Sequence, residues 1–172
     1  MDRRDAGTLS LTRGFLRLLV ALNLGMGILI LILLIASLLA ETWVMNALGV
    51  PPGDAGMIRR GRLIMLLGIG AVPLAHLVLS RLLAIVETVR TGDPFVAGNA
   101  ARLRGIAWAV LGLELLHLAV GAVAAAVSTE AAPLDVDWSF SPTRWLAVLL
   151  LFVLAGVFEQ GARMRADLEG TV

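Results

Sequence analysis

The sequence contains no cysteine, no lysine and no tyrosine, and only 16% of its 172 residues are charged. Without cysteine, disulfide bonds, thiolate metal sites and cysteine nucleophiles are excluded. Soluble domains carry about 25% charged residues, so the low charge places this chain outside that class. The chain instead has 59% hydrophobic residues and a mean hydropathy of +0.90. These values are typical of an integral membrane protein.

Recognisable enzyme signatures are also missing. The sequence has no glycine-rich phosphate loop, no His-Glu-x-x-His motif and no Ser-His-Asp arrangement. No two carboxylates are placed for general acid and base chemistry within the membrane. We therefore expect a protein that is not an enzyme, holds no metal and uses no cofactor.

Four apolar stretches are long enough to cross a bilayer, which needs about 20 residues. They cover about residues 18–40, 63–86, 106–127 and 145–160. The first is too long for a signal peptide, and Glu41 and Trp43 follow it in place of a small-residue cleavage site. We predict an all-α fold, with residues 1–172 forming a single transmembrane domain. Its four spans form an antiparallel four-helix bundle, with a polar leader at 1–17 and a cytoplasmic loop at 87–105.

All fourteen basic residues are arginine, and their distribution predicts the orientation. With the amino terminus inside, ten arginines flank inner span ends and four flank outer ones, as the positive-inside rule requires. The tryptophans agree, since Trp43, Trp138 and Trp145 fall at outer boundaries and Trp108 at an inner one. We therefore expect a multi-pass protein of the bacterial cytoplasmic (inner) membrane with both termini in the cytoplasm.

The loop at 87–105 is the longest polar interruption in the chain. Pro94 disfavours a helical Asp93, so the preceding helix should end by about Gly92. Asn99 then offers an N-cap to the next helix.

Small and polar residues recur at helical spacing within the spans, a pattern typical of helix contacts in membranes. In the first span the pattern consists of Asn23, Gly27, Ile30, Leu34, Ser37 and Glu41, and in the fourth of Trp145, Leu149, Phe152, Gly156, Glu159 and Arg163. Gly105, four residues from both Ala101 and Ala109, allows close helix approach or contact with a second copy in a homodimer.

Several polar residues lie deep within the spans. At 1.5 Å per residue, Glu114 is roughly 12 Å from the inner boundary, and His76 and His117 both lie near mid-membrane. We predict one buried polar cluster, made of Asn23, His76, Ser80, Glu114 and His117. Three interpretations follow: a hydrogen-bonded group that fixes helix packing, proton-coupled transport through Glu114, and haem or metal binding through His76 and His117.

Two segments carry a family resemblance. Gly92-Asp93-Pro94-Phe95, Asn99 and the run from Arg102 to Trp108 resemble the signature of DUF2975, a bacterial family of four-span membrane proteins without established activity, although Ala107 replaces the expected glycine. The endings 157–163 and 167–172 are similar to that family's tail. The resemblance implies a small cytoplasmic-membrane protein. Many genomes encode such proteins beside a small helix-turn-helix regulator, which suggests that regulator as a partner.

The most specific residues all fall on the predicted inner side, so we expect a regulator or adaptor that binds a cytoplasmic protein and makes no direct contact with nucleic acid. The expected partner-facing residues are Asp93, Pro94, Phe95, Asn99, Arg102, Arg104, Glu159, Arg163 and Asp167. The alternative is structural. These residues then serve as caps and lipid anchors, and the loop pairs with the tail through Arg102 or Arg104 and Glu159 or Asp167.

Overall fold

The computed structural model describes residues 3–47, 49, 55–92, 95–125 and 141–169. Five helices follow one another in the chain: α1 (Arg3–Leu39), α2 (Glu41–Ala47), α3 (Ala55–Arg90), α4 (Ala97–Ala125) and α5 (Pro142–Glu169). All but the short α2 are long and apolar enough to cross a membrane. The predicted all-α fold with four spanning helices is confirmed, and the chain is a multi-pass membrane protein.

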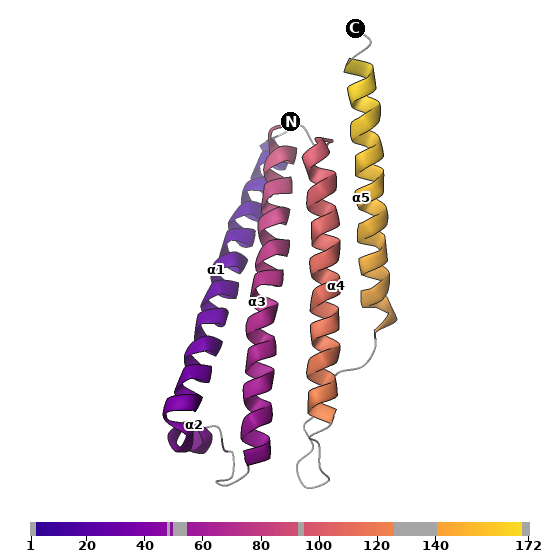
Figure 1. Ribbon diagram of the computed structural model, residues 1–172. Coiled ribbons are helices and arrows are strands. Elements are labelled where there is room, and N and C mark those ends of the chain that lie inside the picture. The colour runs from indigo at the N-terminus through magenta and orange to yellow at the C-terminus, as the bar shows by residue number, and fades with distance from the viewer. Residues whose placement is uncertain (1–2, 48, 50–54, 93–94, 126–140, 170–172) are drawn as a thin grey trace.

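The four long helices alternate in direction and stand side by side in an open row (Figure 1). α1 packs on α3, α3 on α4 and α4 on α5, while no comparable packing joins α1 to α5 within the described ranges. α5 is also displaced parallel to the helix axes, so its last turns extend beyond the other helices (Figure 1). We call the end where α1 begins and α5 ends the termini end, and the opposite end the α2 end.

The helices are longer than the apolar stretches that predicted them. α1 includes most of the predicted polar leader, and the predicted loop at 87–105 is largely helical, because α3 continues to Arg90 and α4 begins at Ala97. Polar residues near a membrane boundary can remain helical because the interface hydrates their side chains. Gly92 terminates α3 with a φ of +86°, which glycine adopts without a steric penalty. The prediction that α3 ends by Gly92 is confirmed.

Close contacts between small residues hold α1 against α3. Asn23 donates from Nδ2 to the carbonyl oxygen of Val72 at 3.1 Å. Gly27 lies so near Val72 that an added Cβ would come within 2.9 Å of its Cγ1, and Gly68 of α3 faces Ile30. The contact pattern predicted for the first span is therefore confirmed at these positions.

The contact between α3 and α4 fixes how these two helices are aligned. Gly70 faces Leu116, and a Cβ added at Gly112 would lie 3.1 Å from Cδ1 of Leu74. Because the helices are antiparallel, these two pairs place His76 level with about residue 110 of α4. This alignment locates the polar residues of both helices.

The fourth predicted contact pattern is only partly correct. Phe152 of α5 meets Trp108 of α4 edge to face, with ring centroids 5.2 Å apart, whereas Leu149 is 58% exposed and Gly156 has open space around it. Val148 and Ala155 are buried in their place. The side of α5 that meets α4 is therefore rotated relative to the predicted one.

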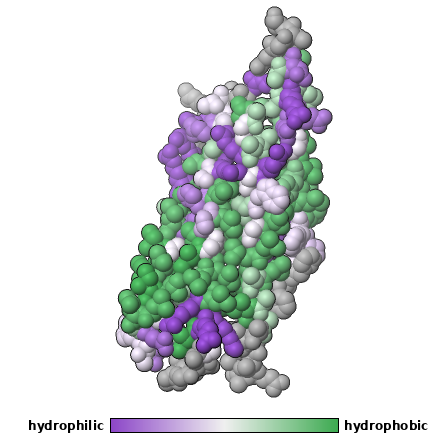
Figure 2. Space-filling view, viewed as in Figure 1, coloured by the Kyte–Doolittle hydropathy of each residue, from purple (hydrophilic) through white to green (hydrophobic). Residues whose placement is uncertain are grey.

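The polarity of the surface changes from one end of the helices to the other. Figure 2 shows hydrophobic residues forming a broad belt around the middle, with hydrophilic residues gathered toward the two ends. A belt of this kind suits the hydrocarbon core of a bilayer, with the polar ends at the two membrane surfaces.

Candidate functional site

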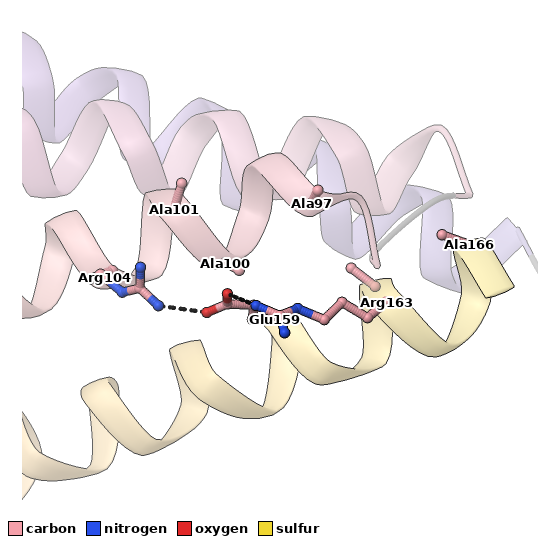
Figure 3. A pocket seen from close by; sticks show the side chains of 8 residues that line it. Ala97, Ala100, Ala101, Arg104, Glu159, Arg163 and Ala166 are labelled. Carbon is pink, nitrogen blue, oxygen red and sulfur yellow. Dashed lines mark hydrogen bonds and ion pairs between the residues drawn. The ribbon is translucent and has the colours of Figure 1, made fainter.

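A groove lies at the termini end, between the first turns of α4 and the last turns of α5. It has a volume of about 320 Å³ and is lined by Ala97, Ala100, Ala101, Arg104, Glu159, Ala162, Arg163 and Ala166. Most of its lining is therefore alanine, and the charged side chains form one part of its wall (Figure 3). Small side chains on both helices leave room for another surface to approach closely.

Two arginines from different helices share one carboxylate in this wall. Arg104 Nη2 lies 2.5 Å from Glu159 Oε2, and Arg163 Nη2 lies 2.7 Å from Glu159 Oε1 (Figure 3). The alternative prediction that the loop region pairs with the tail is confirmed for Arg104 and Glu159. Both carboxylate oxygens are engaged, so the group of three carries one net positive charge and leaves guanidinium donors available on each arginine.

Phe95 packs beside this groove. Its ring lies 5.4 Å from that of Phe158, measured between centroids, and an added Cβ at Gly161 would come within 3.1 Å of its Cδ1. Phe95 nevertheless remains 44% exposed. It therefore attaches the segment before α4 to α5 while still presenting apolar surface, as the partner-facing prediction requires.

Asn99 does not belong to the partner-facing surface, because it is fully buried. It lies inside the first turn of α4 rather than at its N-cap, and its Nδ2 donates to Thr88 Oγ1 of α3 at 2.7 Å. Its Oδ1 accepts from Arg102 Nη1 at 2.7 Å. Both expectations for Asn99 are thus corrected: a polar side chain near a helix start can equally well join two helices. Arg102 is turned toward this internal bond.

The remaining predicted partner-facing residues fall into two groups. Asp167 is exposed on the protruding part of α5. Asp93 and Pro94 lie outside the described residues, as do Trp138 and the rest of the segment at 126–140.

Three residues of the predicted polar cluster have partners outside it. Asn23 bonds to Val72, and Ser80 donates to the carbonyl oxygen of Leu77 in its own helix at 3.2 Å. Glu114 instead forms an ion pair with a residue outside the predicted cluster, Arg144. Asn23 and Glu114 therefore each take part in a contact between two helices, whereas Ser80 bonds locally.

The two histidines are not level with each other. His76 is aligned with about residue 110 of α4, seven positions from His117, which corresponds to roughly 10 Å along the helix axis. Nδ1 of His76 and Nε2 of His117 are buried without a hydrogen-bond partner in the structure. This offset does not suit two axial ligands of one haem. Nor do the described residues contain a group of three or more His, Asp or Glu side chains that could hold a metal ion.

Sequence reasoning missed the ion pair between Glu114 and Arg144. Glu114 Oε2 lies 3.6 Å from Arg144 Nη1, and the carboxylate side chain is only 16% exposed. Arg144 is one of the four arginines predicted to flank outer span ends, but the displacement of α5 parallel to the helix axes brings its first turn level with Glu114 (Figure 1). The sequence signal that could have indicated this pair is an acidic residue within one span, Glu114, and a basic residue at the start of the next, Arg144.

Comparison with known proteins yields one match. The family described as "Protein of unknown function (DUF2975)" matches residues 43–172, which include the whole groove. No curated protein and no solved structure matches the chain.

Proposed function

The chain belongs to the DUF2975 family, and we propose that it is a non-enzymatic adaptor of the bacterial cytoplasmic membrane that binds a protein partner at its termini end. The observation that carries this proposal is the groove between α4 and α5. It combines an alanine surface with a positively charged wall, and it lies beside the protruding end of α5.

The groove suggests the chemistry of its partner. Alanines allow a helix to approach closely, and the net positive charge of Arg104, Glu159 and Arg163 favours acidic residues along that helix. We therefore propose an amphipathic helix with small residues on one face and carboxylates at its edge as the occupant. The family resemblance makes a small helix-turn-helix regulator the first partner to test.

The distribution of arginines supports a cytoplasmic termini end. Arginines are concentrated there, and cytoplasmic segments of membrane proteins carry the excess of basic residues. A soluble cytoplasmic partner could then reach the groove without crossing the bilayer.

Proton-coupled transport is the less supported alternative. It needs a carboxylate that is free to gain and lose a proton, whereas Glu114 is held in an ion pair with Arg144. Ser80 bonds to Leu77 of its own helix, and Nδ1 of His76 is buried without a hydrogen-bond partner in the structure, so neither of these atoms passes a hydrogen bond on to Glu114.

The adaptor proposal is tested by crosslinking and pulldown from native membranes. The test variant fills the groove through Ala101→Leu and Ala166→Leu, and the control places the same substitution at Ala147, which is exposed on α5 away from the groove. We expect one protein partner to be recovered with the wild type and the control, and lost with the filled groove. Recovery of lipid and self-contacts alone from all three would contradict the proposal.

A further inference from the structure

Arg81 of α3 has no carboxylate partner among the residues that the structure describes. Its one hydrogen bond there runs from Nη1 to the carbonyl oxygen of Ala101 in α4, at 3.4 Å. By contrast, Arg104 on the neighbouring part of α4 is already paired with Glu159. A guanidinium has five N–H donors, so most of those on Arg81 are left for another acceptor.

The position of Arg81 makes an unsatisfied charge costly. It lies within a spanning helix, five residues before the end of the apolar stretch at 63–86, which is roughly 8 Å along the helix axis. Its backbone is level with about Gly105, and its side chain extends toward Ala101, closer to the termini end. This is the direction in which a long basic side chain reaches the headgroup region.

Gly105 provides the space in which the guanidinium lies. A Cβ added at Gly105 would coincide with Nη1 of Arg81, and the three atoms nearest to it all belong to the Arg81 side chain. The glycine predicted to bring two helices together therefore accommodates an arginine against the backbone of α4. Because Gly105 has no side chain, the Arg81 guanidinium has room to lie at this point of α4.

The surroundings are those of a lipid headgroup site. Trp108, three residues after Gly105, is 61% exposed, and an indole on a spanning helix favours the headgroup level. The hydrogen bond from Arg81 to the carbonyl oxygen of Ala101 is exposed, so the guanidinium lies at an accessible surface of α4. A planar guanidinium matches two phosphate oxygens.

We propose that Arg81, positioned by Gly105, binds the phosphate of an anionic phospholipid in the leaflet at the termini end. Phosphatidylglycerol is favoured over a zwitterionic lipid because its anionic headgroup brings no ammonium to compete with the guanidinium. This inference is independent of the adaptor proposal, since Arg81 does not line the groove.

The test measures lipid retained by the full chain. Protein is reconstituted in phosphatidylcholine containing phosphatidylglycerol and extracted in mild detergent. Native mass spectrometry then measures how much phosphatidylglycerol stays bound to the protein. We compare the wild type with Arg81→Gln and Gly105→Ala, and use Arg17→Gln as the control because Arg17 is an exposed arginine of the same end. We expect phosphatidylglycerol binding to weaken about tenfold in Arg81→Gln, as for loss of a hydrogen bond to a charged group. Gly105→Ala should also weaken it, whereas Arg17→Gln should retain it.

Three results would overturn the proposal. The first is equal retention of phosphatidylglycerol by the wild type and by Gly105→Ala. This variant keeps the charge of Arg81 and displaces its guanidinium, so the test does not depend on the folding of Arg81→Gln. The second is an equal loss in Arg17→Gln, which would indicate general charge attraction. The third is displacement of phosphatidylglycerol by excess inorganic phosphate, which would assign the site to free phosphate.

Discussion

Arg62 of α3 donates from Nε to the hydroxyl oxygen of Ser37 in α1 at 3.3 Å, at a point where Ser37 is fully buried. The same guanidinium forms an ion pair with Glu41 at 2.8 Å. Ser37→Ala should therefore lower the free energy of unfolding by about 1 kcal/mol, because a buried hydrogen-bond acceptor is lost. Reversible unfolding in dodecyl sulfate, followed by circular dichroism, measures this change.

Ser80→Ala is the matched control, since among the described residues the Ser80 hydroxyl bonds only within its own helix. It should change stability less than Ser37→Ala. Equal effects would show that the contact between α1 and α3 contributes no more than a local hydroxyl does.

Two glycines of α1 should respond differently to the same substitution. A Cβ at Gly27 would approach Val72 Cγ1 to 2.9 Å, whereas one at Gly25 would meet nothing within 4 Å. We expect Gly27→Ala to destabilise the protein by about 1 kcal/mol through overpacking, and Gly25→Ala to be neutral or slightly stabilising. The same unfolding assay compares them, and equal stability of the two variants would contradict the packing of α1 on α3.

The ion pair between Glu114 and Arg144 should appear as a coupling energy. We expect Glu114→Gln and Arg144→Gln each to destabilise the protein, and the double variant to lose less than their sum by about 0.5 kcal/mol or more. The half-exposed arginine keeps the expected value small. Additive losses would contradict a direct interaction.

If Glu114→Gln stays folded but abolishes proton-linked substrate flux in liposomes, the transport hypothesis replaces the structural one.

The absence of cysteine makes the orientation directly measurable with single-cysteine variants. Ala97 is exposed at the termini end, and Ala47 is exposed at the end of α2, on the other side of the apolar belt. In intact cells, a membrane-impermeant maleimide should label Ala47→Cys and spare Ala97→Cys until the membrane is opened. Labelling of Ala97→Cys in intact cells would reverse the orientation.

The sequence was most informative where one helix determines its own contacts. Spacing alone identified Asn23 and Gly27 as the side of α1 that meets another helix, because polar and small residues have little reason to gather on a lipid-facing side. The opposite charges of Arg104 and Glu159, and their position on the same predicted side of the membrane, likewise allowed their pairing to be predicted as one of two alternatives.

What the sequence could not provide was the alignment between helices. The axial displacement of α5 decides that Glu114 meets Arg144, and the alignment of α3 with α4 decides that Arg81 lies over Gly105. Both depend on packing between elements, which no local pattern records. Asn99 shows the same limit, because the residue type that caps a helix can also bond to a neighbouring helix.

A row in which every long helix packs on its neighbours in the chain can be assembled in the order of synthesis. Once α3 has entered the bilayer, its contact with α1 can form before α4 and α5 have left the ribosome. Each later helix then packs against the helix that was inserted before it, and the contacts of the early helices do not require the last helix to be present. Biogenesis thus requires only local pairing, which favours rapid folding and limits the time that polar groups such as Asn23 spend unpaired in lipid.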